Sequence, residues 1–133
     1  MRTQYHFRNS PRGLCAWNVH RLVELSSSLV PERVPLSAIR ELDEPYWTNG
    51  EDQRPTCREI ADHARLILDC DLGFPVILSS DGRVMDGMHR ICKALLQGAA
   101  EIDAVRFLHD PEPDYIGVHP DQLPYDDLPY PEV

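Results

Sequence analysis

The stretch GRVMDGMHRICKALLQG, from Gly82 to Gly98, constrains the fold of this chain more than any other. A short apolar segment ends at Asp86-Gly87, and apolar residues then recur at helical spacing up to Gly98. A second apolar run precedes it, and Asp81-Gly82 between the two runs predicts a β-hairpin with a type I′ turn. Gly98 is the expected residue just beyond the end of the helix. The sequence therefore predicts strand, turn, strand and helix in direct succession.

The junction between the second strand and the helix holds the candidate binding residues. They are Asp86, Gly87, Met88, His89 and Arg90. A helix start presents unpaired N–H groups and the positive end of the helix dipole, and a glycine before it lets an anion approach closely. Arg90 adds a guanidinium that matches phosphate oxygens, and His89 can donate a hydrogen bond or act as acid and base. Asp86 could orient His89, accept a substrate proton or bind Mg²⁺. The alternative is an ordinary polar turn, with Asp86 as a helix cap and Arg90 in an ion pair.

Charge is distributed unevenly along the chain. The sequence has 13 Lys and Arg against 22 Asp and Glu, a net charge of −9. No Lys or Arg follows Arg106, where seven acids lie, so residues 1–106 carry only −2. Binding to a nucleic-acid backbone needs a basic surface, which neither part provides. A nucleic-acid partner is therefore disfavoured, whereas a small basic pocket for a phosphate is not.

Composition and cysteine spacing are typical of a globular cytoplasmic protein. Hydrophobic residues make up 42% of the 133 residues, and no run approaches the roughly 18 apolar residues of a membrane span. The polar N-terminus lacks the apolar stretch of a signal peptide. Four scattered cysteines form no CxxC pair and no zinc-type spacing. We expect one cytoplasmic domain with reduced thiols and no membrane partner.

The remaining pattern predicts a mixed α+β order. Thr56 and Glu59 form a capping box for a helix over 56–70, with Arg58 and His63 on its surface and Ile60 and Leu68 on an inward face. The other expected elements are an irregular segment over 1–15, a helix over 16–29, an edge strand over 33–39, a loop over 40–55 and a strand over 101–107.

The chain is divided by composition into three parts. An N-terminal segment with one amphipathic helix spans 1–32, a core spans 33–108, and an acidic, proline-rich tail spans 109–133. Six of the twelve prolines lie in the tail and prevent long regular elements. Its spaced aromatic and aliphatic residues, among them Leu128 and Tyr130, favour packing on the core over an extended peptide for a protein partner. The oligomeric state is left open.

The order of a capped helix, the strand PVIL, an Asp-Gly hairpin, the DGMHR turn with its helix and a final strand resembles the ParB/sulfiredoxin superfamily. The segment VPLSAIREL (34–42) is also similar to the first strand and turn of that fold, so the resemblance covers residues 33–107. It implies an α+β fold with a small mixed sheet and flanking helices. In ParB proteins, sulfiredoxins and the free-serine kinases of the superfamily, the corresponding turn binds the phosphates of a nucleotide.

Carried over to this chain, the resemblance assigns phosphate binding to Gly87, His89 and Arg90. Met88 stands where sulfiredoxins have their reactive cysteine, and a thioether cannot form a thiolate, so sulfiredoxin activity is disfavoured. Met88-His89 also replaces the acid-arginine pair of ParB proteins, and no helix-turn-helix segment follows the core. DNA partitioning is therefore disfavoured as well. Asp86 matches the kinase pattern.

The acidic loop ELDEPYW is the expected source of a catalytic base. The resemblance places the carboxylate of the kinase-like members here, so Glu41 or Glu44 could take a proton from an acceptor hydroxyl or bind Mg²⁺ with Asp86. A solvated acidic turn is the alternative. Tyr46 and Trp47 are expected either to stack on a base or to close the edge of the core.

Together these features predict a small domain that binds a nucleotide or other phosphorylated small molecule at DGMHR. The expected cofactor is ATP, ADP or CTP with Mg²⁺. If the protein is an enzyme, it is a phosphotransferase or nucleotide hydrolase with Glu41 or Glu44 as base, and with His89 and Arg90 stabilising charge on the transferred group. The alternative is a regulatory module that binds a ligand or a protein without catalysis.

Overall fold

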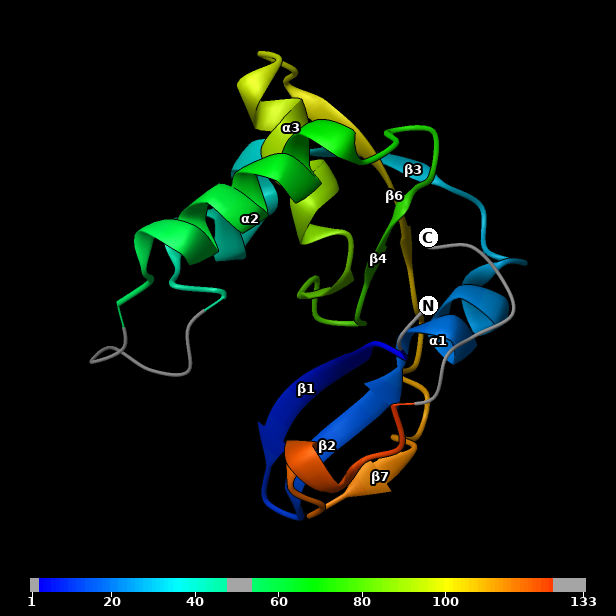
Figure 1. Ribbon diagram of the computed structural model, residues 1–133. Coiled ribbons are helices and arrows are strands. Elements are labelled where there is room, and N and C mark those ends of the chain that lie inside the picture. The colour runs from blue at the N-terminus through cyan, green and yellow to red at the C-terminus, as the bar shows by residue number, and fades with distance from the viewer. Residues whose placement is uncertain (1–2, 48–53, 126–133) are drawn as a thin grey trace.

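A computed structural model describes residues 3–47 and 54–125 and confirms the α+β class. The chain forms two small sheets and three α-helices within these residues (Figure 1). The strands are β1 (Tyr5–Ser10), β2 (Gly13–Asn18), β3 (Glu32–Pro35), β4 (Val76–Leu78), β5 (Val84–Asp86), β6 (Glu101–Arg106) and β7 (Tyr115–Ile116). The α-helices are α1 (Val19–Ser26), α2 (Cys57–Asp69) and α3 (Met88–Leu96), and three 3₁₀ turns are η1 (Leu36–Ala38), η2 (Arg40–Asp43) and η3 (Pro120–Gln122).

The larger sheet has the strand order β3-β6-β4-β5 and is mixed. β3 and β6 are antiparallel, β4 and β6 are parallel, and β4 and β5 form an antiparallel hairpin. β3 lies at the sheet edge, as predicted. Pro35, which has no backbone N–H to donate to a neighbouring strand, is tolerated at this position. The parallel step from β4 to β6 is made across α3, which packs against the sheet.

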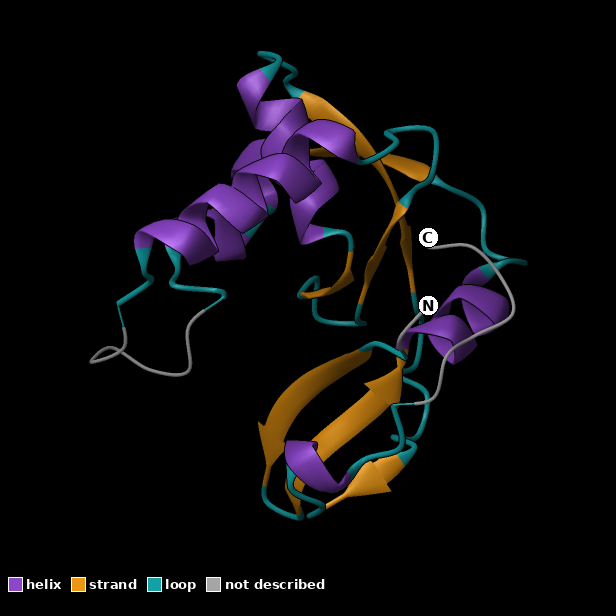
Figure 2. Cartoon of the chain, viewed as in Figure 1, coloured by secondary structure: helices purple, strands orange, loops and turns teal. Residues whose placement is uncertain are grey.

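The two faces of this sheet carry separate cores because neighbouring residues of a strand point to opposite sides. Along β4, Val76 and Leu78 face α3 and the 3₁₀ turns, whereas Ile77 faces β2 and α1. Leu22 of α1 is fully buried in the second core. Figure 2 shows α2 and α3 gathered at one end of the molecule and the smaller sheet at the other. The β4–β5 hairpin is therefore covered on both faces.

The smaller sheet joins the two ends of the chain. It has the order β1-β2-β7, so the N-terminal hairpin pairs with a short strand from the acidic segment. Asp114 accepts a hydrogen bond from Asn18 N–H at 2.8 Å, and Trp17 Nε1 donates to Pro111 O at 2.8 Å. Residues 111–116 are thus held against β2, and Leu123 is also buried.

Several predicted elements are confirmed and four predictions are corrected. The hairpin, the helix before Gly98, the Thr56 cap and the final strand are present, and Gly98 has φ +76° as expected. Residues 5–15 are not irregular but form the strands β1 and β2. The first helix begins at Val19, because Asn18 accepts a hydrogen bond from His20 N–H and residues 16–18 belong to β2.

The hairpin turn is not type I′, which needs positive φ at two residues. Only Gly82 has a positive φ (+84°), and its N–H donates to Ser79 O at 2.9 Å. The predicted inward face of α2 is wrong for two positions, since Ile60 and Leu68 are 56% and 66% exposed. α2 contacts α3, and His63 and Ile67 are its half-buried residues, whereas the rest of this helix is exposed.

The part of the acidic tail that the structure describes, 109–125, lies along the N-terminal hairpin. Tyr5 donates a hydrogen bond to Pro124 O at 2.6 Å, and its ring meets that of Tyr125 edge-on at 5.3 Å. Leu128 and Tyr130 lie outside the described residues. Over residues 3–47 and 54–125, the helices lack the length and apolar composition needed to cross a bilayer.

Candidate functional site

The turn between β5 and α3 brings the predicted DGMHR residues to a cleft. The cleft has a volume of about 1080 Å³ and is bounded by this turn, β1, the end of α2 and the loop before residue 48. All five residues from Asp86 to Arg90 line it. Gly87 is the N-cap of α3 with φ +108°, a conformation that favours glycine. The start of the helix therefore opens into the cleft.

Gly87 is also required by packing. A Cβ at this position would lie 2.6 Å from Val76 Cγ1 and 2.9 Å from Arg90 Nη2. The turn thus lies directly on the core strand β4, which holds it in place. Met88, the next residue, is 5% exposed and belongs to the core between α3 and the sheet. Met88 is both a core side chain and part of the cleft wall.

Arg90 supports the turn from inside. Its Nη1 donates to the carbonyl oxygens of Phe74 and Pro75, both at 3.0 Å, and its Nη2 pairs with Asp86 Oδ2 at 2.8 Å. The Arg90 side chain is only 6% exposed. The guanidinium of Arg90, which was expected to bind phosphate, is therefore directed mainly into the protein. There it joins the β5–α3 turn to the segment before β4.

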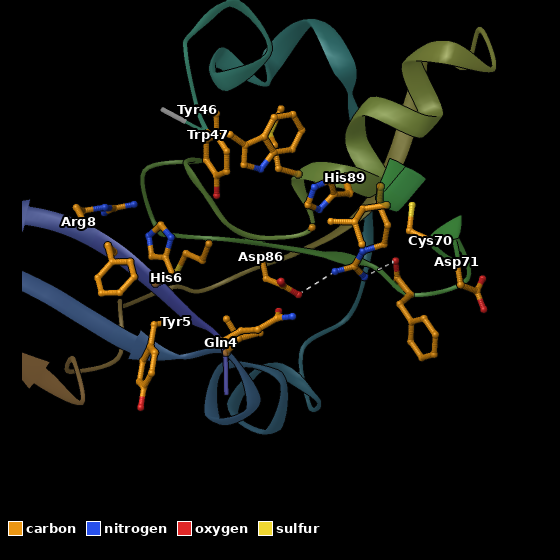
Figure 3. A pocket seen from close by; sticks show the side chains of 18 of the residues that line it. Gln4, Tyr5, His6, Arg8, Tyr46, Trp47, Cys70, Asp71, Asp86 and His89 are labelled. Carbon is orange, nitrogen blue, oxygen red and sulfur yellow. Dashed lines mark hydrogen bonds and ion pairs between the residues drawn. The ribbon is translucent and has the colours of Figure 1, made fainter. Parts of the chain in front are cut away.

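Asp86 lies in the same buried ion pair and faces the cleft (Figure 3). Burial raises the pKa of the Asp86 carboxyl above its usual range, and the charge of Arg90 only partly opposes this effect. Tyr46 points its hydroxyl toward the space between Asp86 and His6 (Figure 3). Burial and the nearby charges of Asp86 and Glu41 raise the pKa of Tyr46 to about 12.

His89 is part of an aromatic group that spans three elements. Its Nε2 lies 3.0 Å from Nδ1 of His63 on α2, and the indole of Trp47 stacks on both rings at 4.7 and 4.3 Å. Burial, followed by the neighbouring His63, lowers the pKa of His89 to about 4. His89 is thus neutral at physiological pH and bound to another imidazole. The prediction that His63 is a surface group is corrected by this contact.

Strand β1 supplies a wall of the cleft that the sequence did not predict. His6 and Arg8 of β1 line it, and His6 Nε2 is a buried atom without a hydrogen-bond partner among the described residues. Burial is the main reason that the pKa of His6 is lowered to about 4, and the charge of Arg8 adds to it. The strand carries no motif; it is held by its pairing with β2 and by Arg8, whose Nη2 donates to Ser79 Oγ of the β4–β5 hairpin at 3.1 Å.

The predicted bases Glu41 and Glu44 do not line the cleft. Glu41 is 5% exposed and accepts a hydrogen bond from Val84 N–H at 2.6 Å. Glu44 binds Arg83 through both carboxylate oxygens at 2.7 and 2.8 Å. Arg83 also lies 3.7 Å from Glu41. Both carboxylates therefore anchor the acidic loop to β5.

The described residues contain no group of three or more His, Cys, Asp and Glu side chains arranged to hold a metal ion. Asp86 is the predicted Mg²⁺ ligand, and one of its oxygens is already bound to Arg90. Mg²⁺ retains several waters and uses one or two carboxylates together with substrate phosphates. The Mg²⁺ assignment stays a prediction that depends on Asp86 and on a bound phosphate.

Comparison of the chain with protein-family models, with curated proteins and with solved structures found no match.

Proposed function

We propose that this protein binds a nucleotide or another phosphorylated small molecule in the cleft at the start of α3. The observation that carries the proposal is Gly87, whose left-handed backbone opens the first turn of a nine-residue helix into a cleft of about 1080 Å³. Backbone N–H groups at such a start favour an anion. The volume is slightly above the range of about 300–1,000 Å³ that is typical of small-molecule sites.

Side chains around this turn suit a ligand with a phosphate and a planar group. His89 lies in the first turn of α3, and Trp47, 37% exposed, offers an aromatic surface above it. Arg90 acts as a positioning residue in this proposal, because its contacts hold Gly87 and Asp86 in place. The element order β3, α2, β4, β5, α3, β6 also supports the ParB/sulfiredoxin-like resemblance, which we retain as a proposal.

A binding module without catalysis is the second candidate, and one observation favours it. Glu41 and Glu44, the expected bases, are held by Val84 and Arg83 outside the cleft lining. Phosphoryl transfer would then depend on Asp86 or His89 to handle the acceptor proton. ATP, ADP or CTP with Mg²⁺ stays the proposed ligand set for both candidates.

The test is a titration of the ¹⁵N-labelled protein with ATP, ADP, CTP and GTP, with and without Mg²⁺. We expect saturable amide shifts centred on Gly87, Met88 and His89. The variant His89→Glu places a negative charge in the first turn, which stabilises a helix start but repels phosphate. It should weaken binding, whereas the matched variant His89→Gln, without the charge, should bind more tightly than His89→Glu.

The same titration separates the two candidates when phosphate release is followed in parallel. Release or transfer that is lost in Asp86→Asn or His89→Gln supports an enzyme. Binding without turnover supports the module. Absence of amide shifts at 86–90 with every nucleotide, or equal binding by His89→Glu and His89→Gln, would overturn the proposed phosphate site.

A further inference from the structure

Helix α2 carries an apolar strip that the described residues leave uncovered. The helix packs on α3, which in turn packs on the larger sheet (Figure 1). None of the 13 residues of α2 is buried. Ile60 and Leu68 are 56% and 66% exposed, and Ala64, midway between them, is exposed as well. Residues four positions apart share one face of a helix, so these three side chains form a continuous apolar strip.

A second row of side chains beside this strip is charged and alternates in sign. Successive residues of a helix are about 100° apart, so the four members of the row fall within an arc of about 60°. They are Arg58, Asp62, Arg65 and Asp69, and all are exposed. Asp62 and Arg65 form an ion pair at 3.5 Å, with side chains 57% and 71% exposed. A pair this open to water contributes little to the helix itself and leaves both charges available to a partner.

The apolar strip is symmetric about its centre. If a second α2 runs in the opposite direction, with a two-fold axis at Ala64, then Ile60 of each copy lies level with Leu68 of the other, and the two Ala64 side chains meet. Ala61, which is exposed beside the strip, is also small. Small side chains at the centre let two helix axes approach to about 8 Å, while the larger Ile60 and Leu68 close both ends of the contact.

The charged row is complementary to itself in the same arrangement. The two-fold axis that makes the helices antiparallel keeps this row on the same side of both copies. Arg58 then lies within one residue, about 1.5 Å along the axis, of the level of Asp69 of the second copy, and Asp62 is equally near the level of Arg65. Every charge in the row therefore meets an opposite charge. A parallel pair would place the two rows on opposite sides of the contact, so the pattern favours the antiparallel pair.

We propose that α2 is a dimerisation surface, on which α2 of a second copy of this chain packs in the antiparallel arrangement centred on Ala64. A helix of 13 residues is about 20 Å long, so the contact is smaller than the roughly 800 Å² per partner of a stable interface. The dimer is therefore reversible and depends on the protein concentration. This inference rests on α2 alone and does not require that the cleft bind a nucleotide.

Sedimentation velocity of the full chain, from low micromolar to near-millimolar concentration, tests the dimer. We expect the wild type to pass from monomer to dimer over this range. Ala64→Glu places two like charges together on the two-fold axis and should weaken the dimer about tenfold or more. Its circular dichroism should not change, because Ala64 is exposed and glutamate is a good helix former. The matched variant Ala99→Glu adds the same charge at an exposed alanine outside the helices and should dimerise as the wild type does.

A charge exchange tests the orientation of the two helices. Asp62→Arg brings like charges together at two symmetry-related positions and should weaken the dimer about fivefold or more at low ionic strength. Adding Arg65→Asp restores opposite charges across the contact, so the double variant should return to within about threefold of the wild-type dissociation constant.

Three outcomes would contradict the proposal. A wild type that stays monomeric over the whole concentration range would overturn it and leave the apolar strip to a different partner or to solvent. Equal dissociation constants for the wild type and Ala64→Glu would also overturn it, because the dimer contact would then lie elsewhere. Failure of the double variant to regain affinity would overturn the antiparallel arrangement.

Discussion

Replacing Gly87 by alanine tests whether the turn at the cleft is held by its contact with β4. The structure predicts two separate costs. A non-glycine residue at φ +108° is strained by about 1–3 kcal/mol. The new Cβ would also lie 2.6 Å from Val76 Cγ1 and 2.9 Å from Val76 Cβ, on a side chain with 0% exposure. Overpacking of this kind costs about 1–3 kcal/mol, so Gly87→Ala should lose about 4 kcal/mol of unfolding free energy.

Gly98→Ala is the matched control because it separates strain from packing. Gly98 has φ +76°, and nothing lies within 4 Å of a Cβ built there. The variant should lose only about 1–2 kcal/mol, the strain of a left-handed residue. Urea denaturation of both variants at pH 7.5 measures the difference. The close contact between Gly87 and Val76 would be refuted if Gly87→Ala lost no more stability than Gly98→Ala.

A double-mutant cycle then identifies the neighbour. Val76→Ala removes Cγ1, the atom nearest the new Cβ, at a cavity cost of its own. Because the clash is partly relieved, Gly87→Ala should cost less in the Val76→Ala background than in the wild type. Strictly additive effects would mean that the clash is relieved elsewhere and not through Val76.

Three further predictions concern the buried polar groups around the cleft. The pKa of His6 is about 4 when folded and 6.5 when unfolded, so the unfolded chain takes up a proton first, and stability falls as the pH drops from 6.5 to 4. Urea denaturation at pH 7.5 and 4.5 should show that the wild type loses about 2.5 kcal/mol more unfolding free energy than His6→Phe. Equal losses would contradict the burial of His6. Glu41→Ala should lower the unfolding free energy by about 1–3 kcal/mol, because a buried N–H loses its acceptor, whereas Glu44→Ala should change it by less than about 1 kcal/mol. Similar unfolding midpoints for these two variants would count against an anchoring role for Glu41. Arg90→Ala should lower the unfolding free energy by about 3 kcal/mol, because a buried carboxylate and two carbonyl oxygens lose their hydrogen-bond donor. Thermal or urea unfolding measures this loss. An unfolding midpoint equal to that of the wild type would show that the guanidinium is not buried.

The last prediction also affects how the phosphate site can be tested. Arg90 is the obvious residue to remove when a phosphate-binding arginine is suspected. Its three oxygen partners at Asp86, Phe74 and Pro75 mean that its removal disturbs the whole turn. Loss of binding in Arg90→Ala would not distinguish contact with a ligand from loss of the turn, which is why His89→Glu and His89→Gln are the sharper pair.

Local features of the fold could be read from the sequence because neighbouring residues determine them. The cap at Thr56, the hairpin at Asp81-Gly82 and the left-handed Gly98 all depend on side chains within a few positions. The position of DGMHR at a strand-to-helix junction was predicted for the same reason. The first helix was placed too early, since Trp17 fits a helical period but belongs to β2, whose pairing with β1 is not visible in a local window.

The candidate site was only partly predictable, because its partners come from distant segments. His63 and His89 are 26 positions apart in sequence, and nothing in their spacing indicated the 3.0 Å contact. Glu41 and Val84 are separated by 43 positions, so an acidic loop that suggested a catalytic base is an anchor for β5. Each of these contacts depends on how α2 and the loop lie on α3 and β5.

The sequence by itself determined that Asp86–Arg90 begin a helix after a strand, with a glycine where the backbone must be left-handed. Short-range sterics and hydrogen bonding are sufficient for that. Only the tertiary structure decided where each side chain points: Arg90 inward to carbonyls, His89 to His63, and Asp86 into the cleft beside β1. These directions depend on burial and on charges brought together by packing. The same packing shifts the pKa values of His6, Tyr46 and Asp86, which no composition or spacing could indicate.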